Sequence, residues 1–189
     1  MQAAYTEHIN HHAMFVTLYW KSLKSRIFIN AMIGEIENMN VKELDEYVIK
    51  VLKKNGWNED RKYDADEWIK KLSAEGYCIN EYAKEILCEL GNINVRENVT
   101  EEHNCATFDF NPFYAASGEF DRMEEFEIAS QEKMFPIGAL QDYIMYASKS
   151  KKIYLGDWSS LYIAGDSIEN FLNNMFKKVY EPKEINLKR

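Results

Sequence analysis

The chain has 189 residues, 46% of them hydrophobic and 29% charged, which is ordinary for one soluble globular domain with a substantial core. Its 23 basic and 31 acidic residues give a formal net charge of −8, which argues against a surface for nucleic acid or anionic membrane. The acidic excess is typical of a solubilising surface, and it would also suit a basic protein partner. No apolar run approaches the roughly 20 residues that a membrane-spanning helix needs.

The cysteines indicate a reducing compartment. The chain has three of them, Cys78, Cys88 and Cys105, an odd number without disulfide or metal-binding spacing. We therefore predict a cytoplasmic protein without a disulfide scaffold, a metal site or a cofactor.

Residues 1–38 differ in character from the rest of the chain. They hold three of the four histidines, with no complementary cluster downstream, and three basic and three acidic residues, so the whole net charge of −8 belongs to residues 39–189. Two interpretations stay open for this segment: an extension upstream of a true start at Met32 or Met39, or an amphipathic arm that binds a membrane or a partner. We predict a single domain over residues 39–189.

Three amphipathic helices are predicted in the first half of this domain. The first follows Asn40 and Glu43, which have the spacing of a capping pair, and it ends at Gly56. The second runs over 64–76 and the third over 80–90. Each carries apolar residues at helical spacing, which predicts that one face packs against a core.

A tryptophan and an arginine lie in the predicted turn after the first helix. Trp57 and Arg61 could form a binding hot spot, because these residue types are enriched at interfaces. The alternative, which we favour, is a buried ring with an arginine that donates hydrogen bonds to loop carbonyls.

The apolar pattern then changes from helical to alternating, which predicts strands. Two strands are expected at 93–99 and 105–110, followed by an acidic helix at 119–130. The next strand, 134–138, contains Pro136, which cannot donate to a sheet ladder, so we place this strand at an edge.

The stretch that follows is a meander closed by a helix. Strands are predicted at 142–147, 153–155 and 161–164. Asp166 stands three residues before Glu169, which predicts an N-terminal cap for the last helix. Helices, then strands, then a helix indicate an α+β fold.

No residue pattern predicts catalysis. His103 and Cys105 could share one face of a strand, but no third residue completes a hydrolase triad. Adjacent glutamates at 101–102 and 124–125 could act as acid and base, yet neighbouring acids on a helix point apart and usually form a solvated face. The glycines stand singly at the ends of elements, so no phosphate-binding loop is predicted.

Four motifs, taken in order, resemble a known family. They are Gly56-Trp57 with Arg61, Phe108-Asp109-Phe110 with Pro112, Phe135-Pro136-Ile137-Gly138, and Tyr154 and Gly156 followed by Ile163-Ala164-Gly165-Asp166-Ser167. Their order and spacing resemble the third family of the SUKH superfamily of immunity proteins over about 41–179. The resemblance implies a mostly antiparallel sheet of about five to six strands flanked by helices.

The resemblance also implies a non-catalytic protein that binds and neutralises a cognate toxin, often a nuclease. We expect it to be monomeric when free. The alternative is an intracellular adaptor or regulatory scaffold of the same fold without a toxin partner.

Candidate contacts for a basic partner are acids that speed encounter and an aromatic anchor. The acids are Glu101, Glu102, Glu124, Glu125 and Asp157. Trp158 is the candidate anchor because it follows Gly156-Asp157 where a strand ends. In the alternative, which we slightly favour, the Trp158 ring packs into the core and the acids only solvate the surface.

Overall fold

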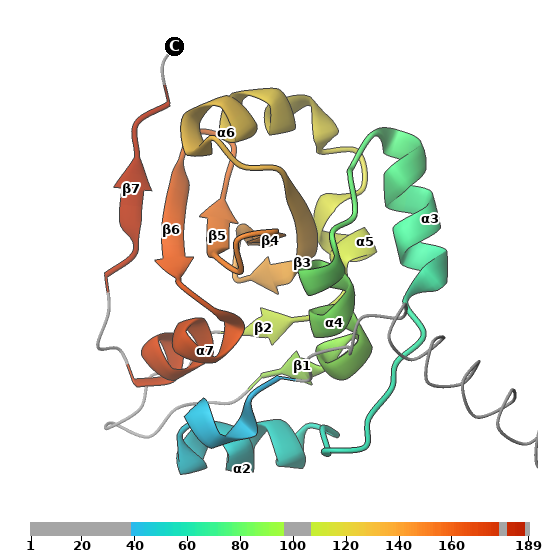
Figure 1. The fold of residues 1–189 in the computed structure, drawn as a ribbon, viewed down its shortest axis with the longest axis vertical. Helices are drawn as coiled ribbons and strands as arrows, with labels where there is room; N and C mark the ends of the chain where they lie inside the picture. Colours follow the sequence, from blue (N-terminus) through green and yellow to red (C-terminus); the bar gives the residue numbers. More distant parts are fainter. Residues whose placement is uncertain (1–38, 97–106, 178–180, 188–189) are drawn as a thin grey trace, which may run out of the picture. The chain divides into compact units, whose positions relative to one another are not determined.

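The computed structural model describes residues 39–96, 107–177 and 181–187, and it confirms the α+β class. The helices of the described part are η1 (Val41–Glu43), α2 (Glu46–Lys54), α3 (Asp66–Glu75), α4 (Glu81–Leu90), α5 (Pro112–Ala116), η2 (Phe120–Arg122), α6 (Met123–Ser130) and α7 (Ile168–Lys177). The strands are β1 (Asn94–Val95), β2 (Phe108–Asp109), β3 (Met134–Leu140), β4 (Tyr143–Ser148), β5 (Ile153–Gly156), β6 (Leu161–Gly165) and β7 (Lys183–Ile185) (Figure 1). The expectations for residues 1–38 lie outside the described residues and stay predictions.

These strands form one antiparallel sheet in which each strand pairs with the next along the chain, in the order β1 to β7. The described residues thus form seven strands, more than the five to six predicted. The additional strand is β7, which pairs with β6 through Leu161 opposite Ile185. Its three residues show no clear strand pattern in the sequence. They form a strand because they pair with β6.

The strand β3 lies inside the sheet, between β2 and β4, so its predicted place at an edge was wrong. Pro136 is nevertheless tolerated because β2 pairs only with the far end of β3, at Ala139 and Leu140. A bulge between Pro136 and Gly138 shifts the register against β4. Gly138 has a φ of +150°, and a Cβ there would lie 2.1 Å from the Asp109 carbonyl oxygen, so the bulge requires glycine.

The first helix begins later than Asn40, because residues 41–43 form only the short 3-10 helix η1. Its predicted cap is therefore wrong: Asn40 donates through Nδ2 to Glu43 Oε1, and Asp45 caps α2 by accepting from the Tyr47 N–H. The break between η1 and α2 is held by Asn173 of α7, which accepts from the Asp45 N–H at 2.8 Å and donates to the Glu43 carbonyl at 2.7 Å.

Two further helix starts depend on short polar side chains. At α7, Ser167 and not Asp166 is the cap, since its Oγ accepts from the Asn170 N–H at 3.1 Å. The helix α5 was not predicted from the sequence. Asn111 caps it by accepting from the Tyr114 N–H, and Pro112 occupies its first turn.

The core joins the sheet to the helices through aromatic rings. Phe108 of β2 contacts Phe171 and Phe176 of α7, with ring centroids 5.7 and 5.2 Å apart. α4 lies beside α7, where the Tyr82 hydroxyl accepts from the Ile168 N–H at 2.7 Å. Among the described residues, no helix combines the length and apolar character of a membrane span.

Candidate interaction surface

A hollowed surface lies where η2 and α6 meet the turns at one end of the sheet. Two neighbouring hollows share this region. The first, which we call the acidic groove, has a volume of about 230 Å³ and is lined by Ala115, Glu119, Arg122, Phe126, Asp142, Ile144, Tyr146, Gly156, Asp157 and Trp158. The second, the α6 hollow, has a volume of about 440 Å³ and is lined by Asp121, Glu124, Glu125, Ile128, Ala129, Gln131 and Asn186.

Trp158 stands at the tip of the turn between β5 and β6. Asp157 closes this turn, because its Oδ1 accepts from the N–H groups of Ser159 and Ser160, both at 2.7 Å. The Trp158 ring is 70% exposed, so the interpretation in which it packs into the core is wrong. An exposed tryptophan in a fixed turn presents a large apolar surface to solvent.

Arg122 connects the turn to α6. Its guanidinium lies 5.4 Å from the centre of the Trp158 ring and 5.8 Å from that of Phe126. It also forms an ion pair with Glu125, with 2.7 Å between Nη2 and Oε2. Trp158 and Glu125, which are 33 positions apart in the sequence, are thereby joined through one side chain.

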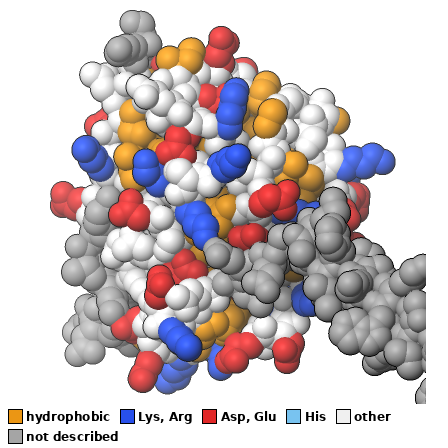
Figure 2. All heavy atoms as spheres, in the orientation of Figure 1, with side chains coloured by type: hydrophobic (Ala, Val, Ile, Leu, Met, Phe, Trp, Pro, Cys, Tyr) orange, Lys and Arg blue, Asp and Glu red, His pale blue; other side chains and the backbone are white. Residues whose placement is uncertain are grey.

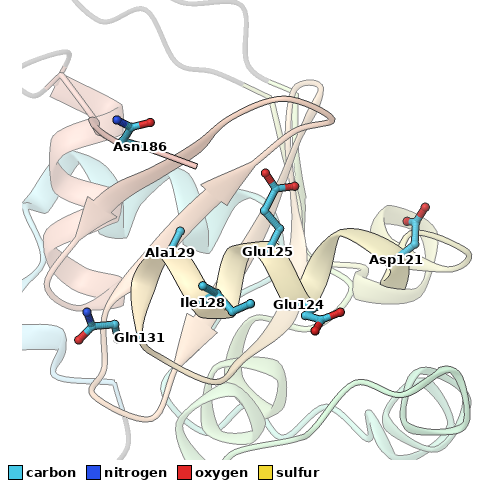
Figure 3. A pocket seen from close by; sticks show the side chains of 7 residues that line it. All are labelled: Asp121, Glu124, Glu125, Ile128, Ala129, Gln131 and Asn186. Atoms are coloured by element: carbon cyan, nitrogen blue, oxygen red, sulfur yellow. The ribbon is translucent and has the colours of Figure 1, made fainter. Parts of the chain in front are cut away.

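The α6 hollow follows the outer side of α6. Figure 3 shows side chains from η2, α6 and Gln131 along one wall, with Asn186 approaching from the segment after β7. Ile128 is 66% exposed here, the second large apolar side chain that this region presents to solvent. Its acidic neighbours are Asp121, Glu124 and Glu125.

The charge of the two hollows is strongly one-sided. Their linings contain the six acids Glu119, Asp121, Glu124, Glu125, Asp142 and Asp157, against one base, Arg122. The face drawn in Figure 2 shows acidic and basic side chains interspersed. The combination of exposed apolar groups and uncompensated acid is typical of a surface that meets a basic partner.

Four of the six predicted contact residues belong to these linings, namely Glu124, Glu125, Asp157 and Trp158. Glu101 and Glu102 lie outside the described residues. Sequence reasoning missed Glu119, Asp142 and Arg122. The spacing of Arg122 and Glu125, one helical turn apart, was the only local signal for the ion pair.

The Gly56-Trp57 and Arg61 motif lies in the loop between α2 and α3. The Trp57 side chain is only 2% exposed. Arg61 donates from Nη2 to the Gly91 carbonyl at 2.5 Å and from Nη1 to the Gly56 carbonyl at 3.5 Å. Both side chains therefore make contacts within the fold.

The other motif residues also make internal contacts. Phe108 and Phe110 are fully buried, and Asp109 accepts from the Asn94 side chain at 2.9 Å. Pro136 and Ile137 are buried beside the Gly138 bulge. A Cβ on Gly156 would lie 2.8 Å from the Phe126 ring, and one on Gly165 would lie 2.7 Å from Phe171 Cβ, so each glycine permits close packing.

A polar cluster around Glu132 is the alternative place to look for chemistry. Its carboxylate accepts from Ser150 Oγ at 2.5 Å and from Lys152 Nζ and the Tyr154 hydroxyl, both at 3.1 Å. Burial opposes the charged form of Glu132, but these hydrogen bonds outweigh it and hold the pKa of this carboxyl below its ordinary value. Desolvation and the nearby Glu132 raise the pKa of Tyr154. The cluster holds the β4–β5 hairpin to the segment after α6.

The structure shows no group of three or more His, Cys, Asp or Glu side chains arranged to hold a metal ion within the described residues.

Comparison with known proteins identifies one family. The model of the SUKH-3 immunity protein family matches residues 44–178, close to the 41–179 expected from the motifs. No curated protein and no solved structure gives a significant match. The matched range includes both hollows except Asn186.

Proposed function

The chain belongs to the SUKH-3 immunity protein family, and from this premise we propose that it binds and neutralises a cognate toxin in the cytoplasm of the cell that makes it. The family match over residues 44–178 is the observation that carries the proposal. Neutralisation is stoichiometric: the protein covers a working surface of the toxin and does not catalyse a reaction.

The charge of the protein fits a basic toxin, such as a nuclease. A nuclease presents positive charge where the phosphates of its substrate bind. An acidic protein therefore meets it quickly through electrostatic steering and occupies the same region. The net charge of −8 and the one-sided linings of the two hollows both support this choice of partner.

The acidic groove and the α6 hollow are the proposed contact region. Acids such as Glu124 and Asp157 increase the rate of encounter, together with Glu101 and Glu102. Trp158 then provides the buried anchor that slows dissociation, because aromatic residues dominate the binding energy of protein interfaces. Glu125 positions Arg122 beside the anchor through their ion pair.

Co-expression with the toxin encoded beside this gene tests the function. We expect restored growth and co-purification as an equimolar complex, formed from a monomeric free protein. Titration of purified toxin should end at one equivalent, since a stoichiometric inhibitor does not turn over. Full protection by catalytic amounts, abolished by Cys105→Ala, would contradict a non-catalytic mechanism. A stable complex with a protein that is not toxic would support an adaptor instead.

A further inference from the structure

We propose that the acidic groove receives a single basic side chain, arginine or lysine, from the toxin. This inference rests on the proposed function and specifies how the groove recognises its partner. Its basis is the pairing of an apolar floor with an acidic rim, a combination that matches a side chain with an aliphatic stem and a cationic head.

The floor of the groove is apolar and closely packed. It is formed by Phe126 of α6, Ile144 and Tyr146 of β4, and Gly156 of β5. The Phe126 and Tyr146 rings meet edge to face, with centroids 6.1 Å apart. Gly156 permits this close packing, since a Cβ there would press on both rings, at 2.8 and 3.0 Å.

The rim carries two carboxylates that make no hydrogen bond or ion pair among the described residues. Glu119 and Asp142 are exposed, and within the described residues neither carboxylate has an assigned hydrogen bond or ion pair. Asp157 differs, because its Oδ1 holds the β5–β6 turn. Trp158 forms the side wall of the groove.

The one base in the groove does not cancel this preference. Arg122 is already paired with Glu125 at 2.7 Å, so the pair adds little net charge. Its guanidinium lies over the Trp158 ring and steadies that wall. Three carboxylates, Glu119, Asp142 and Asp157, remain to attract a cation.

The size of the groove also favours one side chain over a small-molecule ligand. Its volume of about 230 Å³ lies below the roughly 300–1,000 Å³ of typical ligand pockets. A long basic side chain fills such a space while its parent chain stays on the surface outside.

The first test measures binding of the complete chain to the toxin domain encoded by the neighbouring gene. We expect Trp158→Ala, and separately Glu119→Gln with Asp142→Asn, to weaken affinity at least about tenfold, as for central interface residues. The control is Glu46→Gln with Asp60→Asn, which removes the same charge from exposed sites of the α2 region and should change affinity less than about twofold. Unchanged melting temperatures establish that all variants fold. A complex that forms with affinity within twofold of wild type in both groove variants overturns the inference while the proposed function stands.

If the wild-type chain binds no toxin, the proposed function fails. A second test then decides whether the groove still binds a basic side chain. Here N-acetyl-arginine amide is titrated into the ¹⁵N-labelled complete chain, with the neutral N-acetyl-citrulline amide as control. The Trp158 indole signal, assigned by its loss in Trp158→Ala, should shift saturably with the arginine compound only. The shift should vanish when Glu119 and Asp142 are neutralised. No saturable shift, or an equal shift with both compounds, overturns the inference.

Discussion

The loop between α2 and α3 and the turn between β5 and β6 each carry a tryptophan close behind a glycine, and the fold uses the two rings in opposite ways. Trp57 is 2% exposed and lies against the first helices, whereas Trp158 is 70% exposed at the tip of its turn. Arg61, four residues after Trp57, donates hydrogen bonds from its guanidinium to the carbonyls of Gly56 and Gly91. Trp158 has beside it a guanidinium paired with Glu125 and a groove with free carboxylates.

The acids of the molecule divide in the same way. Glu169 is buried and accepts from the Asn40 N–H at 2.7 Å, and Glu89 accepts from the Met39 N–H at 2.6 Å. Glu124, at the α6 hollow, and Asp142, at the acidic groove, are exposed. Trp57 and these two carboxylates thus serve the fold, whereas Trp158 and the exposed acids remain available to a partner. Changes in the first group should alter stability, and changes in the second should alter binding.

The largest expected effect separates the two tryptophans. Trp57→Ala should destabilise the protein by about 3–5 kcal/mol, because it removes a buried ring and leaves a cavity. Trp158→Ala should change the free energy of unfolding by less than about 0.5 kcal/mol, as for other exposed positions. Denaturant titration of both variants measures the difference. A Trp57→Ala protein with wild-type stability and lost toxin binding would reverse the comparison.

The next effect concerns Glu132, whose carboxylate accepts several hydrogen bonds within the fold. Glu132→Gln should cost about 1–2 kcal/mol at neutral pH, since it weakens charge-assisted hydrogen bonds from Ser150, Lys152 and Tyr154 that are partly screened by solvent. The exposed Glu124→Gln is the matched control and should leave stability unchanged.

The pH dependence of the Glu132 effect has a definite sign. The folded state lowers the pKa of this carboxyl, so its contribution is present above the ordinary carboxyl pKa of about 4.3 and is lost as the pH falls through the lowered value. The stability difference between wild type and Glu132→Gln should therefore shrink in acid. A difference that grows below about pH 4 contradicts this account.

A smaller effect should appear only in the kinetics of binding. Neutralising Glu101, Glu102 and Glu124 together should slow association with the toxin about three- to tenfold at low ionic strength and flatten its salt dependence. Dissociation should change little, in contrast to Trp158→Ala, which should mainly accelerate it. Stopped-flow measurements over a range of salt check both. Association that does not depend on ionic strength in the wild type removes the electrostatic part of the mechanism.

The smallest effect is expected from shortening the chain. A protein that starts at Met39 should melt cooperatively within about 4 °C of the full chain. The Met39 nitrogen lies 2.6 Å from Glu89 Oε1, so a new amino group there would face a carboxylate. Calorimetry of the two forms measures this. A large fall in melting temperature would show that residues 1–38 contribute to the fold of residues 39–189.

Local pattern alone predicted most of the elements. The helices α3 and α4, the strands β4, β5 and β6, and the helix α7 lie within a few residues of their predicted ranges. Their signals are periodic apolar residues bounded by turn and capping residues, which act within a few positions of the chain. The order of these elements was sufficient for the α+β class, and the ordered motifs were sufficient for the family.

Errors arose where a distant segment decides the local structure. The first helix starts at Glu46 because Asn173 of α7 holds the break before it. β7 is a strand because its residues pair with the edge of β6. Pro136 lies within a central strand because β2 is too short to reach it.

The candidate surface shows the same limit. The sequence determined that acids and a tryptophan occur at Glu124, Glu125, Asp157 and Trp158, and that the chain carries excess negative charge. Sequence reasoning favoured a buried ring for both Trp57 and Trp158, since both follow similar turn signals. Only the tertiary structure decided that Trp57 is covered while Trp158 is exposed. It also placed Arg122 between Glu125 and Trp158 and put Glu119 and Asp142 across one groove. Burial depends on which segments the fold brings over a residue, and the residue's own neighbours in the chain carry no record of that.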